Sequence, residues 1–300
     1  MSSSEKSEWD RISDCQFLKK IKEGGYGKVF LVKNKNGERE VIKAIPKIKN
    51  GRLDQSFKQE VEALNALRGL DAVVEMRCSD SATLISYRFI VLELLDVTVD
   101  ELRRKNETKT FKPITTLQIL WELVNIFEAI HLRCFFHRDT MLSNLMMKYT
   151  PEFSMMKIVD FGLACSFTDA TKPSAINFIE GTFSSPLVSQ GHPFKCSEEM
   201  ISIALLAVHL ASGSVPWGDS NSQMMLEKKI KFLEKPEFVL PQGAHYIIPF
   251  ITATKKLTYG DAVDYHKLRK ILSAEYIARA KKVVNDMFGV KMIDGNFFME

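Results

Sequence analysis

Hydrophobic and polar residues alternate in the first third of the chain, which is the pattern of half-buried β-strands. Residues 27–32 read GKVFLV and residues 40–45 read EVIKAI, and the cluster NKNG lies between them at Asn34–Gly37. Asn and Gly adopt the backbone conformations that tight hairpins need. We therefore expect an antiparallel hairpin here, with a strand before it at Phe17–Ile21 and a later one at Phe89–Leu92.

Apolar residues at three- and four-residue spacing predict helices in the rest of the chain. One lies in the first third, and all the others follow residue 96. A chain with strands first and helices later belongs to the α+β class. The expected helices are Phe57–Leu70, Thr116–Leu132 with Thr116 as N-cap, a helix from Ser197 ended by Gly213, Glu227–Leu233, Tyr265–Leu272 and Ala274–Met287.

Two short motifs each bring a carboxylate to the end of an apolar segment. Phe136–Leu145 reads FHRDTMLSNL, with Asp139 five residues before Asn144, and Lys157–Gly162 reads KIVDFG, with Asp160 after a strand-like run. Phosphate transfer to a hydroxyl needs a proton acceptor, and it needs metal held on carboxylate and amide oxygens. Asp139 suits the first task, and Asn144 with Asp160 suits the second. Either motif alone also occurs as a surface ion pair or a strand end, but their order and spacing indicate a protein kinase.

A glycine-rich run, Gly24–Gly27, separates the first two predicted strands. Glycines let backbone amides approach a phosphate without interference from side chains. Alone, the run predicts a simple hairpin equally well. With Val29 two residues after the last glycine and Lys43 on the next strand, it resembles the nucleotide flap and phosphate-anchoring Lys of kinases.

The first predicted helix offers two acidic partners for Lys43. Glu60 begins the run E-x-x-x-L-x-x-L that is expected of the helix whose Glu pairs with the strand Lys. We favour Glu60 over Glu62, and an ion pair on the surface of the helix that involves Lys58 remains the alternative.

Together these segments resemble a protein kinase of the casein kinase 1 superfamily over about residues 14–275. Leu92–Leu102 reads LELLDVTVDEL, similar to the family's ELLGPSLEDL. The GSVPW run at Gly213–Trp217, the Leu257–Leu268 stretch, and Gly181-Thr182 in place of an Ala-Pro-Glu motif indicate the same branch. The resemblance implies a bilobal kinase fold, with a flexible tail at 1–13, a small β-rich N-lobe at 14–92, a hinge at 93–96, a larger helical C-lobe at 97–287 and a C-terminal tail at 288–300.

The resemblance also assigns the site, with ATP and Mg²⁺ as cofactors. Lys43 would hold the α- and β-phosphates and pair with Glu60, Asp139 would accept the hydroxyl proton, and Asn144 and Asp160 would bind the metal. Leu92 would be the gatekeeper, Glu93 and Leu95 would offer backbone groups to adenine, and Ile21, Val29, Val41 and Leu145 would enclose the base. The full nucleotide-binding set is Ile21, Lys22, Glu23, Gly24, Gly25, Tyr26, Gly27, Val29, Val41, Lys43, Glu60, Leu92, Glu93, Leu95, Leu145 and Asp160.

Four positions depart from the family's pattern. Lys22 stands where the first flap Gly belongs, and Met141 replaces the Lys two residues after the catalytic Asp. Glu199 stands where an Asp should tether the backbone of the catalytic loop, and the extra methylene must be accommodated by repacking at a cost of about 1–3 kcal/mol. Ser184 stands near an Arg that in the family binds a substrate phosphate. The shorter loop makes that last alignment loose.

Composition and charge limit the cellular compartments and the classes of partner that we expect for the protein. The 300 residues are 45% hydrophobic, no apolar run approaches the roughly 20 residues of a membrane span, and the polar start resembles no secretory signal. Five scattered Cys suggest neither a metal site nor a disulfide framework, so we expect a cytoplasmic or nuclear protein. A net charge of +4, from 41 basic and 37 acidic residues, is too balanced to suggest nucleic acid. The excess of basic residues in 1–52 fits solvated strand faces, or a positive lobe that attracts polyphosphate or acidic proteins.

The function expected from these observations is a serine/threonine kinase of acidic protein substrates. The segment 181–199 offers only Lys195 and His192 as basic groups, so we expect weak recognition of an already phosphorylated substrate. The lysines of the next helix, Lys228, Lys229 and Lys231, could supply compensating charge.

Two alternatives remain open from the sequence. A low-activity kinase fold that serves as a binding or scaffold module is suggested by Lys22, Met141 and Glu199 taken together. A small-molecule phosphotransferase is a third possibility, against which the chain lacks the insertions that would shape such a pocket. No feature fixes an oligomeric state.

Overall fold

The computed structural model describes residues 15–24, 27–49, 52–81, 86–171, 181–218, 220–284 and 288–299. The chain forms two compact units. The first comprises Met1–Leu95 with Val159–Ala164, and the second comprises Asp96–Ile158 with Cys165–Glu300. The boundary after Leu95 falls within residues 93–96, where the sequence predicts a hinge. A β-rich first unit and a helical second unit confirm the predicted fold class.

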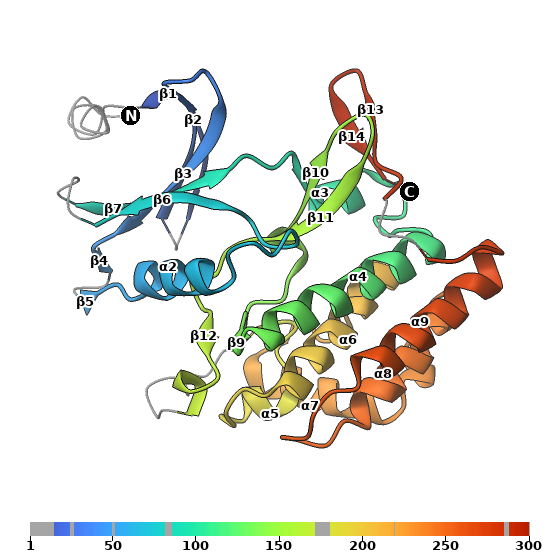
Figure 1. The fold of residues 1–300 in the computed structure, drawn as a ribbon. Coiled ribbons are helices and arrows are strands. Elements are labelled where there is room, and N and C mark those ends of the chain that lie inside the picture. Colours follow the sequence, from blue (N-terminus) through green and yellow to red (C-terminus); the bar gives the residue numbers. More distant parts are fainter. Residues whose placement is uncertain are drawn as a thin grey trace. The chain divides into compact units, whose positions relative to one another are not determined.

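The first unit is built on a five-stranded antiparallel sheet (Figure 1). The predicted turn at Asn34–Gly37 is present: the Gly37 N–H donates to the Asn34 carbonyl at 2.9 Å, and Gly37 has a φ of +84° that Gly adopts without strain. In spatial order the strands are β1 (Cys15–Gly24), β2 (Gly27–Asn34), β3 (Arg39–Pro46), β7 (Tyr87–Glu93) and β6 (Met76–Asp80).

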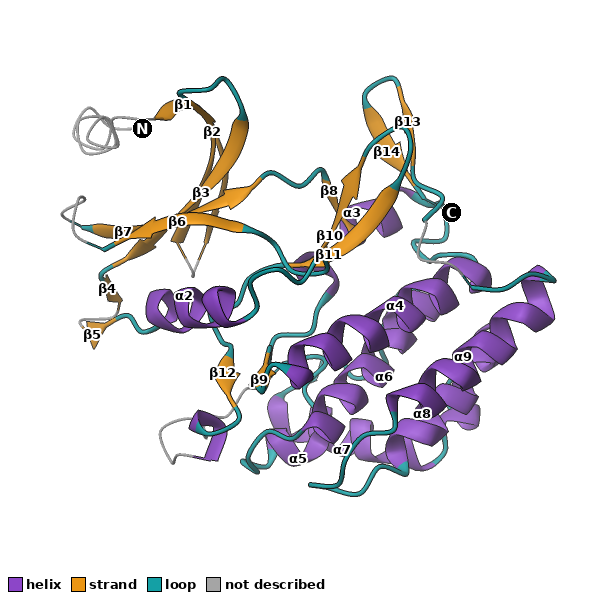
Figure 2. Ribbon diagram, in the orientation of Figure 1, coloured by secondary structure: helices purple, strands orange, loops and turns teal. Residues whose placement is uncertain are grey.

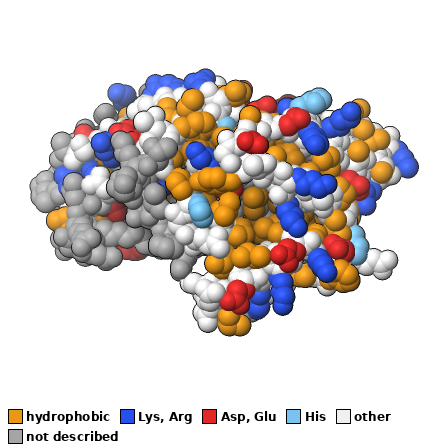
Figure 3. All heavy atoms as spheres, turned by 90° about the horizontal axis from the view of Figure 1, so that it is seen from below, with side chains coloured by type: hydrophobic (Ala, Val, Ile, Leu, Met, Phe, Trp, Pro, Cys, Tyr) orange, Lys and Arg blue, Asp and Glu red, His pale blue; other side chains and the backbone are white. Residues whose placement is uncertain are grey.

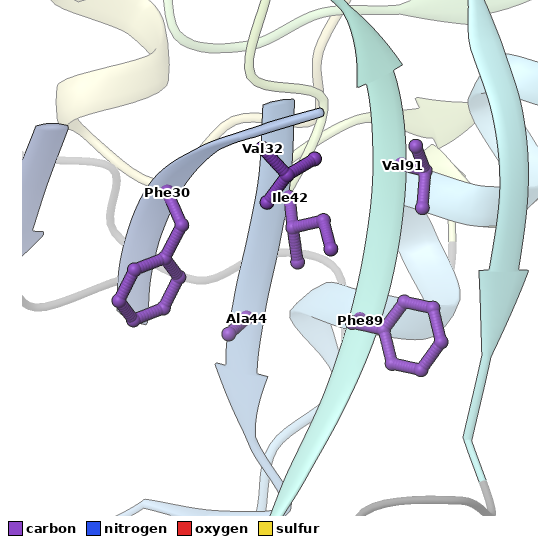
Figure 4. Close-up of a cluster of buried hydrophobic side chains, with 6 residues drawn as sticks. All are labelled: Phe30, Val32, Ile42, Ala44, Phe89 and Val91. Atoms are coloured by element: carbon purple, nitrogen blue, oxygen red, sulfur yellow. The ribbon is translucent and has the colours of Figure 1, made fainter. Parts of the chain in front are cut away.

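One face of this sheet carries an apolar cluster (Figure 4). Its members come from three neighbouring strands: Phe30 and Val32 from β2, Ile42 and Ala44 from β3, and Phe89 and Val91 from β7. In the strand register Ile42 pairs with both Phe30 and Val91, and Ala44 pairs with Phe89. Because side chains alternate between the faces of a strand, burial of Ile42 and Ala44 on this side sends Val41 and Lys43 to the other side. The hydrophobic alternation thus determines which face Lys43 occupies.

Helix α2 (Ser56–Ala66) contacts β6 and β7 of the sheet. It follows two short paired strands, β4 (Ile48–Lys49) and β5 (Arg52–Leu53). It buries Phe57, Glu60, Ala63 and Leu64. The helix is shorter than the predicted Phe57–Leu70, because the chain turns at Leu67 and Gly69 takes a φ of +85°.

Helices make up most of the second unit (Figure 2). α4 (Pro113–Leu132) contacts α6 (Cys196–Ser212) and α9 (Tyr265–Ala280), and α8 (Ile248–Lys255) packs on both α6 and α9. α4 and α6 are apolar around most of their circumference, as central helices are. The other helical elements are α3 (Val99–Lys105), α5 (Pro186–Ser189), α7 (Ser222–Glu234) and the short 3₁₀ turns Leu142–Asn144, Asp169–Thr171, Pro236–Phe238 and Gln242–Ile247.

Three helix predictions need correction. Thr116 is not an N-cap, because α4 begins at Pro113, where a missing N–H costs no helical hydrogen bond. The segments Tyr265–Leu272 and Ala274–Met287 are not two helices. They form the single helix α9 as far as Ala280, and residues 285–287 lie outside the described ranges. Gly213 ends α6 as predicted, with a φ of +76°.

Short sheets complete the second unit. β10 (Leu145–Tyr149) pairs with β11 (Ser154–Ile158) and with β8 (Val97–Thr98), and β9 (Phe135–Phe136) pairs with β12 (Cys165–Ser166). These pairings place β10 directly after the predicted catalytic loop and β9 directly before it.

The described part of the predicted C-terminal tail, residues 288–299, contains a hairpin that belongs to the second unit. Its strands are β13 (Lys291–Ile293) and β14 (Asn296–Phe298). Asn106 Nδ2 donates to the Met299 carbonyl at 3.1 Å, and Lys105 Nζ donates to the Phe297 carbonyl at 3.0 Å. Within the described ranges, no helix has the length and apolar character needed to cross a membrane.

Candidate active site

Lys43 is held by two carboxylates in the first unit. Its Nζ lies 2.6 Å from Glu60 Oε2 and 2.7 Å from Asp160 Oδ1. Lys43 is 8% exposed and Glu60 is fully buried. The competing acid Glu62 lies on the exposed side of α2 and pairs with Lys58 at 3.6 Å. The structure therefore selects Glu60 from the two partners that the sequence left open.

The charges of this group determine its protonation. Burial alone would lower the pKa of Lys43, but the charges of Glu60 and Asp160 outweigh burial and raise it above its ordinary value. Burial raises the pKa of Glu60, against the attraction of Lys43. Lys43 thus stays an ammonium at neutral pH. With both carboxylates ionised the trio has a net charge of −1, which suits the approach of a divalent cation.

The glycine of the Asp160–Gly162 turn lies close to the carboxylates of the site. A Cβ on Gly162 would lie 3.3 Å from Asp160 Oδ1, 3.5 Å from Ser56 Cβ and 3.7 Å from Glu60 Oε2. Asp160 itself has a φ of +66°, a left-handed conformation that Asp tolerates better than most residues. The glycine of the Asp-Phe-Gly sequence therefore leaves room for Asp160 beside Lys43, and a larger residue there would crowd the Asp160 carboxylate.

The glycine-rich flap lies only partly within the described residues. Gly25 and Tyr26, two predicted nucleotide contacts, lie outside them. The others belong to β1 and β2: Ile21, Lys22, Glu23 and Gly24 are exposed at the end of β1, and Gly27 and Val29 begin β2.

Gly27 has a steric role in the flap. It has a φ of +118°, and a Cβ there would meet the Ala44 carbonyl oxygen at 2.1 Å. No other residue fits this approach to β3, the strand that carries Lys43. Val29 lies directly opposite Lys43 in the register.

The predicted adenine contacts of the first unit lie on adjacent strands. Val41 on β3 is paired with Leu92 on β7, and Leu92 and Leu95 are buried. The Glu93 carboxylate accepts the Glu75 N–H at 2.9 Å, and the Glu93 N–H donates to the Glu75 carbonyl at 3.0 Å, so the Glu93 carbonyl is the group that would serve a base. The remaining contact, Leu145, is buried on β10 in the second unit.

The predicted catalytic loop lies in the second unit and is fixed from within. Asn144 Nδ2 donates to Asp139 Oδ2 at 2.8 Å and to the Asp139 carbonyl at 3.0 Å. Asn144 is buried on the turn that leads into β10. The five-residue spacing noted in the sequence thus forms a closed loop in which the amide orients the carboxylate.

Glu199 meets the backbone tether expected of the Asp that it replaces. Its Oε1 accepts the Arg138 N–H at 2.7 Å, and its Oε2 accepts from His131 Nε2 at 2.6 Å. His131 Nδ1 lies 2.5 Å from the hydroxyl of Tyr265, which acts as the acceptor when both ring nitrogens are protonated. The extra methylene of Glu199 therefore leaves the tether intact, and it brings a buried imidazole into the support of the loop.

Electrostatics favour the charged form of His131. Burial alone would lower its pKa, but hydrogen bonds to Cys196 and Glu199 and the charge of Glu199 raise it to about 9. Sequence reasoning missed both His131 and Tyr265. A His on the apolar helix that leads to the catalytic loop is a usable signal for the first, whereas Tyr265 is distant in sequence and has no such signal.

Lys229 is not the surface cation that the sequence suggested. It is 1% exposed, and its Nζ donates to the carbonyls of Gly181 at 2.7 Å and Ser184 at 2.9 Å. Lys228 and Lys231 are exposed, as predicted. On α7, Lys228 and Lys231 are therefore the two lysines that an acidic partner could contact.

Comparison with known proteins agrees with this geometry. Residues 15–258 match the protein kinase domain family. The chain belongs to the protein kinase family. It is 26% identical over 272 residues to the serine/threonine-protein kinase spe-6 of Caenorhabditis elegans, which covers 85% of this chain and 70% of that relative. It is 24% identical over 266 residues to a probable serine/threonine-protein kinase of Dictyostelium discoideum, which covers 86% of this kinase and 53% of the relative. This kinase thus spans about half the length of the Dictyostelium protein.

Proposed function

We propose that this protein is a serine/threonine kinase that transfers the γ-phosphate of ATP to Ser or Thr of acidic proteins. The observation that carries the proposal is the buried Lys43 bonded to both Glu60 and Asp160. A lysine held between a helix carboxylate and the Asp of the Asp-Phe-Gly turn is the arrangement that an active kinase needs around its nucleotide.

Each polar residue of the site has a specific role in this reaction. Lys43 binds the α- and β-phosphates, and Glu60 keeps the ammonium in place. Asp139 accepts the proton of the acceptor hydroxyl. Its Oδ2 is held by Asn144, and its Oδ1 accepts no hydrogen bond from the described residues, so Oδ1 is the atom assigned to the proton.

The donor set fits magnesium. Asp160 supplies carboxylate oxygen and Asn144 supplies amide oxygen, the hard ligands that Mg²⁺ takes from proteins. When bound, the metal neutralises the charge on the phosphates. The adenine contacts follow the family's pattern: the backbone of Glu93 and Leu95, and the side chains of Ile21, Val29, Val41, Leu92 and Leu145.

We further propose a divergent place in the casein kinase 1 superfamily. The hinge-like segment Leu92–Leu102, the GSVPW run and the Gly181-Thr182 pair support it. Where Figure 3 draws described residues, Lys and Arg side chains are interspersed with acidic and apolar ones. The exposed Lys228 and Lys231 are the candidates for contact with an acidic substrate.

A low-activity binding module is the competing function, and the structure weakens one of its three supports. Glu199, which keeps the carboxylate of the Asp it replaces, still accepts the Arg138 N–H. Lys22 and Met141 are exposed and break no internal contact of the described residues. The binding module therefore rests on Lys22 and on the loss of a Lys at position 141, and metal can supply much of the positive charge that this Lys would bring.

The deciding experiment is transfer of labelled phosphate from ATP and Mg²⁺ to an acidic protein such as casein, with Asp139→Asn as the paired variant. We expect transfer by the parent protein, and a loss of about 10²–10⁴-fold in the variant. Nucleotide binding by Asp139→Asn, measured by calorimetry, should stay close to that of the parent. Equal transfer rates in the two proteins would refute the assignment of the loop, and no transfer by the parent would favour the binding module.

A further inference from the structure

A short turn in the second unit, Gly181–Ser185, is fixed by side chains from outside it. The Ser184 N–H donates to the Gly181 carbonyl at 3.1 Å and closes the turn. Trp217, fully buried, donates its Nε1–H to the Thr182 carbonyl at 2.8 Å. Lys229 Nζ donates to the carbonyls at both ends of the turn, those of Gly181 and Ser184. Three of the backbone carbonyls of this turn are therefore bound by two buried side chains.

The C-terminal end of the turn has its own anchor. Ser185 Oγ donates to Glu198 Oε2 at 2.5 Å and accepts the Val188 N–H at 3.3 Å, which caps α5. Ser185 is fully buried and Glu198 is 1% exposed. The turn is thus held to α5 and α6 on one side and to α7 on the other.

Lys229 is the unusual member of this group. Lysine is almost never fully buried without an acidic partner, because the ammonium loses its hydration. The hydrogen-bond partners of Lys229 within the described residues are the two carbonyls, and burial lowers its pKa to about 8. Such a placement is costly unless the carbonyls take over the role of water, so the turn and the lysine stabilise each other.

We propose that Lys229 is a positioning residue that holds the Gly181–Ser185 turn in the conformation that receives the acceptor peptide. The proposal rests on the proposed kinase function, in which this turn belongs to the segment next to the acceptor. The lysine is buried and donates two hydrogen bonds to backbone carbonyls, so it orders the turn and does not itself bind an acidic substrate. The buried ammonium of Lys229 thus fixes the backbone conformation of this turn.

Lys229→Met is the sharpest test, because Met fills a similar volume without donating a hydrogen bond. We expect faster amide hydrogen exchange at residues 181–185 and an increase of about tenfold in KM for an acidic peptide. The kcat at saturating peptide and the KM for ATP should stay within about twofold of the parent values. A role confined to folding would not separate peptide KM from kcat in this way.

Lys228→Met is the matched control, since Lys228 is exposed on the same helix and bonds Ser220 Oγ at 2.7 Å. It should leave amide exchange at 181–185 unchanged. If Lys229→Met does not fold, Lys229→Gln keeps a neutral NH₂ donor group and should show an intermediate increase in exchange. Exchange rates equal to the parent's in a folded Lys229 variant would overturn the proposal. A parent protein without transfer activity would instead refute the kinase function, while amide exchange would still report on the turn.

Discussion

Single residues decide whether the site can react, and Met141 is the clearest example. Its side chain is 37% exposed beside the catalytic loop, where most serine/threonine kinases carry a Lys that touches the transferred phosphate. Met141→Lys should add a charge-assisted contact worth about 1.5–3 kcal/mol. At ~1.4 kcal/mol per decade, the transfer rate should rise about tenfold to hundredfold. Steady-state transfer to a fixed peptide measures this change, and an unchanged or lower rate would mean that another cation, with Lys22 the first candidate, already fills the role.

His131 gives a second prediction at the residue scale, because its pKa is about 9 in the folded protein and about 6.5 when unfolded. A raised folded pKa means that the stabilisation is fully present below pH 6.5 and is lost as pH rises through about 9. The free energy of unfolding should therefore fall over this window by at most about 3 kcal/mol from this group. Urea titrations of the parent and of His131→Gln should differ in that slope, with the variant flatter.

His266→Gln is the control for that experiment, because His266 is exposed on the same unit. It should reproduce the pH dependence of the parent. Equal slopes in the parent and in His131→Gln would show that the imidazole near Glu199 is not held in its charged form.

At the scale of elements, the end of α6 depends on one glycine. Gly213 has a φ of +76°, and a Cβ there would lie 3.3 Å from the Lys109 carbonyl oxygen and 3.3 Å from Thr110 Cγ2. Gly213→Ala combines backbone strain with crowding, so it should lower the free energy of unfolding by about 1–2 kcal/mol. Chemical denaturation measures the loss. Gly243→Ala, with nothing within 4 Å of its Cβ, is the matched control and should change stability much less.

The elements also show what the sequence can predict. Alternation at 27–32 and 40–45 and the Asn34–Gly37 turn were sufficient for the first hairpin, because its contacts are local. The predicted start of α4 at Thr116 is wrong. Thr is a common N-cap residue, but the helix begins at Pro113, because proline fits the first helical position. The hairpin at 288–299 was missed because its stability comes from contacts with distant residues such as Lys105 and Asn106.

The same distinction holds for the site. Lys43, Glu60 and Asp160 meet as their motifs predict, because a strand, a helix and a glycine turn each place one of them. Nothing in the sequence predicts that Lys229 is buried, because two adjacent lysines on an amphipathic helix usually lie on its solvated face. Its environment is created by a turn that lies far away in the sequence, and only the folded chain shows it.

At the scale of the whole molecule, the question is which substrates the kinase selects. A substrate already phosphorylated near its acceptor offers a doubly charged group, and Arg binds such a group best through its planar pair of donors. The proposed place in the casein kinase 1 superfamily puts Ser184 near the position where relatives carry a phosphate-binding Arg, and Lys229 donates to the carbonyls of Gly181 and Ser184. The exposed Lys228 and Lys231 remain, as flexible point charges that favour acidic stretches in general.

We therefore expect a modest preference for acidic peptides and little further gain from phosphoserine. Three matched peptides decide the point, identical except for Ala, Asp or phosphoserine three residues before the acceptor, with kcat/KM measured for each. Asp should improve on Ala by a few fold, since exposed charge pairs contribute at most about 1 kcal/mol. Phosphoserine should match Asp within about threefold, and both gains should shrink as salt is raised, because exposed charges are screened. A gain of about tenfold or more for phosphoserine over Asp would reveal a dedicated anion site and contradict the assignment of Ser184 and Lys229.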